Sequence, residues 1–175
     1  MATNPVPMSN ITFEVFEDGE RLLGIASVTL SELSLKSTEV AGSGILGSMD
    51  WPIYGQFENA ELTLNFRVVY DTLTKFLSPN AHMLDLRGVY EKYDAATGTR
   101  NVHGLKIVAR GLTKTCNLGK LEPGEASDAE VTLHLDYLKI SDSIDGELFE
   151  LDKFNYKYNV LNQDFFNDVI TALGL

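Results

Sequence analysis

Apolar and polar residues alternate along much of this chain, and that period of two predicts β-strands. Ile11, Phe13 and Val15 occupy every second position of residues 11–16. Asp18-Gly19 follows them, a dipeptide typical of tight hairpin turns. Residues 21–30 are therefore expected to return as the second strand of an antiparallel hairpin.

Three further segments continue the strand pattern. Residues 57–70 place Leu62, Leu64, Phe66 and Val68 on one face and Glu61, Thr63, Asn65 and Arg67 on the other. Residues 82–94 and 100–113 flank a turn at Gly98 and form a second predicted hairpin. Residues 130–137 place Val131, Leu133, Leu135 and Tyr137 inward and Glu130, Thr132, His134 and Asp136 outward. Asp145-Gly146 then turns the chain back into residues 147–158.

Two segments carry helical spacing instead. A short helix of about two turns is expected after Asp71, its predicted N-cap, and before Pro79. A second helix is expected over residues 163–173, with Gly174 as its stop. The whole pattern predicts a single domain over residues 1–175, mostly β or α+β, built as an antiparallel β-sandwich or barrel with a short helix and a C-terminal helix.

Residues 37–56, STEVAGSGILGSMDWPIYGQ, show no alternation and contain four glycines, which favours a long loop over about residues 34–56. The segment nevertheless carries seven apolar side chains: Val40, Ile45, Leu46, Met49, Trp51, Ile53 and Tyr54. A monomer rarely exposes so much contiguous apolar surface. These residues are therefore predicted to make inter-subunit contacts, and the alternative is that the loop folds back over its own sheet.

The composition excludes some classes of function. The chain has 25 acidic against 14 basic residues, a net charge of −11, which speaks against wrapping nucleic acid. Its single cysteine, Cys116, is expected to be a small hydrophobic residue at a strand end and weakly favours a reducing compartment. The first ten residues show no signal-peptide pattern, and no apolar run is long enough to span a membrane.

The sequence shows no catalytic constellation. His82, His103 and His134 lie on separate predicted strands without metal-ligand spacing and are interpreted as surface or interface residues. Gly42, Gly44 and Gly47 match a dinucleotide fingerprint in spacing, but they lie in the predicted loop and not between a strand and a helix. We therefore expect no enzyme activity, no cofactor and no metal.

Several segments, in order along nearly the whole chain, resemble one family. They are residues 24–33 (GIASVTLSEL), Lys36, the glycine-rich residues 41–47, Arg110-Gly111 with Lys114, residues 137–140 with Asp145-Gly146, and the ending Gly174-Leu175. This set is similar to the major tail tube proteins of contractile-tailed phages and R-type bacteriocins. The resemblance implies hexameric rings whose sheets join into a ring-shaped barrel, stacked head to tail inside a contractile sheath, with the 34–56 loop reaching the adjacent ring.

The same resemblance implies partners and a location. The partners would be the sheath protein, baseplate and tail terminator proteins, and the tape measure protein during assembly, with DNA passing through the lumen only in a phage. The particle would assemble in the bacterial cytoplasm. Candidate lumen-facing residues form two rows, either of which could line the pore: Glu61, Thr63, Asn65 and Arg67, or Glu130, Thr132, His134 and Asp136.

Two other readings stay open. One is the tube protein of a bacterial secretion system, which would share the ring-forming fold. The other is a soluble β-sandwich that binds a small ligand or glycan, for which Tyr90, Tyr93, Tyr156 and Tyr158 are the candidate aromatic platform. An enzyme that uses His103 or His134 with a carboxylate is a distant third.

Overall fold

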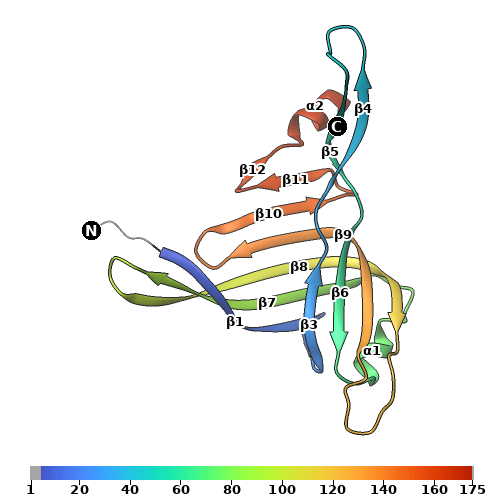
Figure 1. Cartoon of the computed structure of the whole chain (residues 1–175), viewed down its shortest axis with the longest axis vertical. Helices are drawn as coiled ribbons and strands as arrows, with labels where there is room; N and C mark the ends of the chain where they lie inside the picture. The colour runs from blue at the N-terminus through green and yellow to red at the C-terminus, as the bar shows by residue number, and fades with distance from the viewer. Residues whose placement is uncertain (1–4, 175) are drawn as a thin grey trace.

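A computed structural model describes residues 5–174 and shows a mostly β protein with two short helices, as predicted (Figure 1). The strands are β1 (Pro5–Glu17), β2 (Glu20–Leu22), β3 (Ile25–Leu30), β4 (Leu35–Ala41), β5 (Ser48–Phe57), β6 (Ala60–Phe66), β7 (His82–Asp94), β8 (Thr99–Asn117), β9 (Ala129–Asp142), β10 (Gly146–Asp152), β11 (Lys157–Val160) and β12 (Gln163–Asp164). The helices are α1 (Asp71–Lys75) and α2 (Asn167–Leu173). Residues 1–4, at the start of the segment examined for a signal peptide, and Leu175 of the Gly-Leu ending lie outside the described part.

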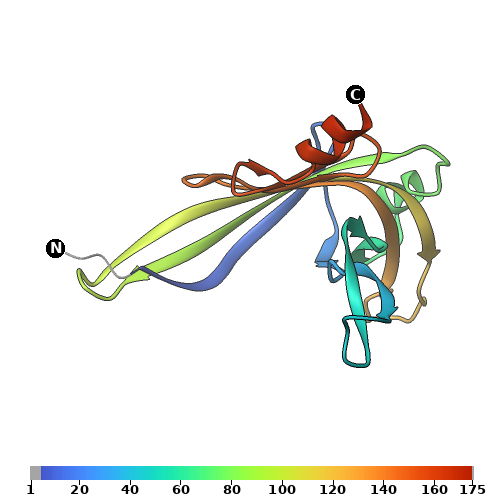
Figure 2. The ribbon, with the colours of Figure 1, turned by 90° about the horizontal axis from the view of Figure 1, so that it is seen from above.

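One antiparallel sheet dominates the molecule. Its strand order is β12-β11-β10-β9-β8-β7-β1-β2, and β6 and β3 branch from β9. The branching is possible because β9 is long: its first half pairs with β6 and its second half with β10, while β8 runs along its other edge. Seen from above, β1, β7 and β8 extend as a broad arm, and the β6 side curls away from it into a half-barrel (Figure 2).

The hydrophobic core fills this half-barrel. The alternating apolar residues of β6 and the first half of β9 point into it, and Leu62, Leu64, Val131 and Leu133 are all completely buried. Helix α1 closes one end, because Leu73 and Phe76 are fully buried and the ring of Phe76 lies 6.1 Å from that of Phe66. The inward rows predicted for these two strands are therefore confirmed from Leu62 to Phe66 and from Val131 to Leu135. Tyr137, also predicted inward, lies on the opposite face, because a register shift between Arg110 and Gly111 brings Leu138 into the core instead.

The segment predicted as a loop is instead a β-hairpin. Strands β4 and β5 form their own two-stranded sheet, joined by residues 42–47, and project from one end of the molecule (Figure 1). The loop prediction was wrong because the glycines were expected to prevent strand formation throughout the segment. Gly42, Gly44 and Gly47 instead lie only in the turn between the two strands. Within β5 an alternation is present after all, with Met49 and Trp51 separated by Asp50.

Four smaller predictions also need correction. The strand expected over 21–30 breaks at Gly24, whose φ of +80° and closeness to the Tyr70 ring suit only glycine, and β3 pairs with β6 instead of β1. Val68 lies beyond β6 and is exposed. The N-cap of α1 is Tyr70, and Asp71 is the first helical residue. At the C-terminus, residues 163–164 form β12, so α2 begins only at Asn167, although it ends at Gly174 as expected.

Candidate assembly surfaces

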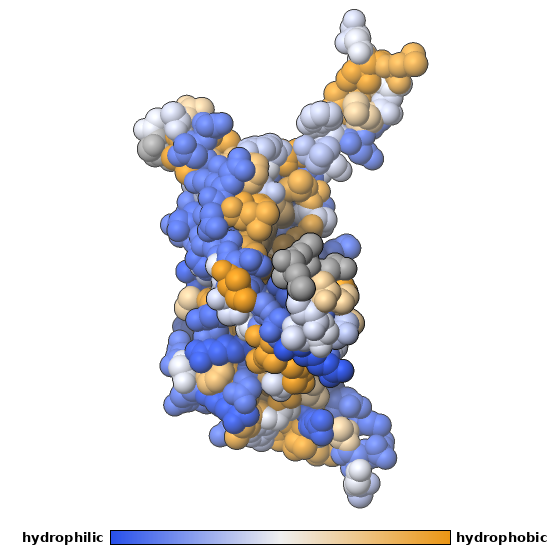
Figure 3. Space-filling view, turned by 90° about the vertical axis from the view of Figure 1, so that its left-hand side faces the viewer, coloured by the Kyte–Doolittle hydropathy of each residue, from blue (hydrophilic) through white to orange (hydrophobic). Residues whose placement is uncertain are grey.

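The β4–β5 hairpin has two chemically different faces. Val40 pairs with Met49 and Thr38 with Trp51, so these four side chains share one face. Glu39 pairs with Asp50 on the opposite, acidic face. A two-stranded ribbon has no interior, and Met49 and Trp51 remain 45% and 57% exposed. The projecting hairpin therefore presents an apolar strip that the described chain leaves uncovered (Figure 3).

The other predicted contact residues lie at the two ends of the hairpin. Ile45 and Leu46 are in the turn at its tip, where Leu46 is fully exposed. Ile53 and Tyr54 are in an irregular part of β5 near its base. Tyr54 stacks on Phe166 and its hydroxyl donates a hydrogen bond to the carbonyl oxygen of Phe165. Six of the seven residues are therefore exposed, including Tyr54 despite its contact with its own chain, and Val40 is half-buried.

An aromatic cluster fixes the base of the hairpin to the C-terminal segment. The Phe57 ring lies 5.0 Å from Tyr158 and 6.3 Å from Phe149, and Tyr156 stacks on Phe166. Gly55, with a φ of +68°, allows this packing, because a Cβ at that position would overlap the Phe166 ring. The hairpin therefore projects from a rigid support even though its own strands lack a core.

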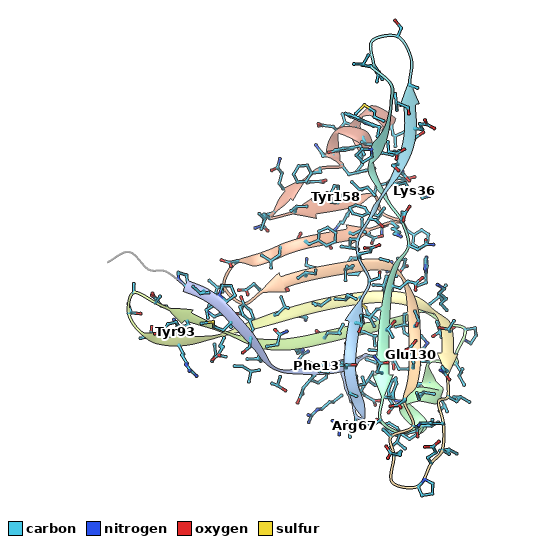
Figure 4. The ribbon with its side chains drawn as sticks, in the orientation of Figure 1. Phe13, Lys36, Arg67, Tyr93, Glu130 and Tyr158 are labelled. Carbon is cyan, nitrogen blue, oxygen red and sulfur yellow. The ribbon has the colours of Figure 1, made fainter. Side chains whose placement is uncertain are left out.

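The two rows predicted for the lumen come together on one surface. Asn65 pairs with Glu130, Thr63 with Thr132 and Glu61 with His134, all on the face of β6 and β9 that points away from the core. Ser27 and Thr29 of β3 extend this surface on one side. The rows predicted as alternatives are therefore neighbours on one polar face, the β3–β6–β9 face (Figure 4).

Three of the eight residues differ from the rest. Arg67 follows the end of β6 and is exposed. Asp136 lies past the last β6 pair, and its carboxylate accepts a hydrogen bond from Arg110 at 3.1 Å. Thr132 is buried, since it lies between Thr63 on β6 and Thr115 on β8.

A second polar face was not predicted. It lies on the outer side of β7–β11, where Lys139 Nζ donates a hydrogen bond to Glu147 at 2.6 Å and Lys106 Nζ is 3.2 Å from Asp85. Tyr137 donates to Glu150 at 2.8 Å. We call this surface the ionic face. The period-two spacing of its charges was present in the sequence, but cross-strand charge pairing depends on a register that only the fold supplies.

Hydrogen bonding and burial on this face shift two pKa values. Hydrogen bonds from Lys139 and Asn159 hold the pKa of Glu147 below its ordinary value of 4.5. Burial, together with the neighbouring Glu150 carboxylate, raises the pKa of Tyr137. Because the folded-state pKa of Glu147 is lowered, its stabilising contribution is present above pH 4.5 and is lost as the pH falls through the lowered value.

The sheet that carries the ionic face has open edges. Strand β1 pairs with β2 only over residues 15–17, so in the described chain its outer edge is free over most of its length. Val6, Met8 and Ile11 on this strand are exposed. On the other side the sheet ends at the two-residue strand β12. Unpaired edges of this kind are the usual sites of strand addition between chains.

A family model described as phage tail tube protein FII matches residues 9–174. The chain belongs to this family. A comparison with curated proteins finds no match. The match supports a structural role in a virion tail, built by assembly with other tail components.

The remaining candidate residues of this tail tube protein hold structural positions. His82 and His103 are buried, contrary to their interpretation as surface residues: His82 Nδ1 lies 2.6 Å from Glu17 Oε1, and His103 stacks on Tyr90. Cys116 near the end of β8 packs against the core, and burial raises the pKa of its thiol. Over residues 5–174, no three metal-ligating side chains gather at one point, and no helix is long and apolar enough to cross a membrane.

Proposed function

We propose that this tail tube protein forms the inner tube of a contractile tail, of a phage or an R-type bacteriocin. Hexameric rings stack into a hollow conduit, which a contracting sheath drives through the envelope of the target cell. The protein assembles in the bacterial cytoplasm with a tape measure protein, and it contacts sheath, baseplate and terminator proteins. DNA passes through the lumen only in a phage.

The uncovered apolar strip of the hairpin is the observation that carries this proposal. A soluble monomer would expose Met49, Trp51 and Leu46 to water at a solubility cost, on a ribbon that contributes nothing to its own core. In a stack of rings, the hairpin lies along a subunit of the adjacent ring and the strip becomes buried. The glycine-rich turn lets the tip adapt to that surface.

We assign the lumen to the ionic face. Closing a ring through continuous strand pairing requires a sheet with two open edges, and the sheet bearing this face has them at β1 and at β11–β12. Its charges are paired with one another, which leaves few isolated cations to retain a passing polyanion. The eight residues predicted for the lumen lie mainly on the β3–β6–β9 face, which is the alternative candidate for the pore wall.

Impermeant thiol labelling of assembled tubes distinguishes the two faces. In a Cys116→Ala background, cysteine replaces either Lys106 on the ionic face or Asn65 on the β3–β6–β9 face. A reagent too large to enter the tube should label the Asn65 variant and spare the Lys106 variant. The opposite result would return the lumen to the predicted rows.

Replacing Ile45, Leu46 and Trp51 together with Ser tests the role of the hairpin. These side chains are exposed, so the fold should be retained while the rings lose stacking. Negative-stain microscopy and sedimentation measure this directly. Polymerisation of the variant at the wild-type rate would refute the role of the hairpin. A strictly monomeric wild-type protein at high concentration, with sheath and baseplate partners present, would refute the tube and favour a ligand-binding β-sandwich.

A further inference from the structure

A pocket of about 330 Å³ lies at the base of the hairpin, between β5 and the β10–β11 segment. Its apolar wall consists of Phe57, Tyr156, Tyr158 and Phe166. Three lysines line it as well: Lys36 from β4, Lys153 after β10 and Lys157 from β11. Figure 4 places Lys36 and Tyr158 on either side of the strand crossing below the hairpin. The pocket thus combines aromatic and cationic surface in a protein with a net charge of −11.

The positive charge of this pocket is only partly neutralised. The carboxylate of Asp152 is occupied by the backbone amides of Phe154 and Asn155 and by the Asn155 side chain. The side chain of Lys36 makes no ion pair or hydrogen bond within the described chain, and Lys157 is a distant 3.8 Å from Glu150. Burial, reinforced by the nearby Lys36 charge, lowers the pKa of Lys153. The site is therefore suited to an anionic group.

The opposite end of the molecule carries a matching projection. Residues 118–128 connect β8 to β9 and form the loop at the far end of the long axis (Figure 1). Their tip, Pro123-Gly124, is flanked by Glu122 and Glu125, and Asp128 follows, against one lysine, Lys120. Leu121 beside the tip is 87% exposed. The loop thus presents an apolar knob with surplus negative charge.

Backbone hydrogen bonds hold this loop in shape. The amide of Ser127 donates to the carbonyl of Arg67 at 2.7 Å, and the amide of Lys120 donates to the carbonyl of Ser127 at 2.8 Å. A preformed loop loses little conformational entropy when it docks. The 118–128 loop is therefore ordered before it meets a partner.

We propose that the 118–128 loop of one copy docks into the Lys36–Lys157 pocket of a second copy in the next ring. Leu121 enters the aromatic part of the pocket, and Glu122 and Glu125 approach the lysines. The hairpin and the 118–128 loop lie at opposite ends of the long axis and toward the same side (Figures 1 and 3). The pocket lies at the base of the hairpin. Head-to-tail stacking would therefore bring the loop of one copy toward the pocket of the next. This inference rests on the proposed tube function and identifies a second contact between rings beside the hairpin.

A charge-swap experiment on the full-length protein tests this contact. One variant, Lys36→Glu with Lys157→Glu, makes the pocket acidic. The other, Glu122→Lys with Glu125→Lys, makes the loop basic. Each variant alone places like charges at every ring junction, so the protein concentration needed for tube formation should rise about tenfold or more. Ring formation, checked by sedimentation, should be unchanged.

Mixing the two variants tests whether the loop and the pocket contact each other directly. The acidic pocket of the first accepts the basic loop of the second, and the wild-type pocket of the second accepts the wild-type loop of the first. Equal amounts should therefore restore tubes in which the two kinds of ring alternate. The matched control, Lys36→Arg with Lys157→Arg, keeps the charge and should polymerise like the wild type.

The other outcomes separate this contact from the tube itself. Wild-type polymerisation by each swapped variant alone would overturn the contact and leave the tube function standing. Failure of the mixture to form tubes would also overturn it, as would normal tubes that have lost only sheath or terminator binding, since the pocket would then serve another protein. A wild-type protein that forms neither rings nor tubes would remove the proposed function and this inference together.

Discussion

The half-barrel and the projecting hairpin use the same alternation of apolar and polar residues with opposite results. In β6, Leu62 and Leu64 are 0% exposed, because β9 flanks them and the core lies above them. In β5, Met49 and Trp51 are 45% and 57% exposed, because the ribbon has no second layer. Alternation therefore predicts an apolar face on a strand, but whether the same chain covers that face depends on the rest of the fold.

The largest expected effect is the difference in unfolding free energy between a substitution in the half-barrel core and one in the hairpin. Phe66→Ala removes a ring that is 1% exposed and packs against Phe76, so it should lower the free energy of unfolding by about 3–5 kcal/mol. Trp51→Ala removes a larger side chain from the hairpin and should change that free energy by less than about 0.5 kcal/mol. Urea unfolding below the assembly concentration measures both. A comparable loss in the two variants would mean that the hairpin apolar strip packs on its own subunit.

An intermediate effect is expected where the hairpin meets the body. Gly55→Ala would strain a residue at φ +68° and push its Cβ into the Phe166 ring, at a cost of about 1–3 kcal/mol. Gly98→Ala is the matched control, since its φ is +70° but its Cβ would meet open space. The difference between the two isolates the overlap with Phe166.

The location of this loss can be measured as well. Amide hydrogen exchange of Gly55→Ala should accelerate mainly in residues 163–174, which the aromatic cluster holds against β5. Equal losses of stability in the Gly55 and Gly98 variants would show that the C-terminal segment does not support the hairpin.

The half-barrel could be predicted from the sequence, and the assembly surfaces only in part. Local alternation in residues 57–66 and 129–137 found the core rows, because their periodicity is set by residues close in sequence. The pairing of Glu61 with His134 joins two strands that α1, β7 and β8 separate in the sequence, so the two rows were treated as alternatives. The hairpin was mistaken for a loop because Gly42, Gly44 and Gly47 masked the short alternation beside them. Its apolar residues were nonetheless predicted to form a contact surface, and most of them are exposed in the described chain.

The smallest perturbation uses the single tryptophan of the chain as its own reporter. Trp51 lies on the apolar strip of the hairpin and is 57% exposed, so in unassembled protein its fluorescence should be red-shifted and readily quenched by iodide. If rings bury this strip when they stack, polymerisation should shift the emission to the blue and reduce quenching, in proportion to the mass of tube. The Lys36→Glu, Lys157→Glu variant should form rings and keep the red-shifted spectrum, because its hairpin is intact but has no neighbour. An unchanged spectrum in wild-type tubes would show that the strip stays in water after assembly, and the contrast between the half-barrel and the hairpin would then need another cause.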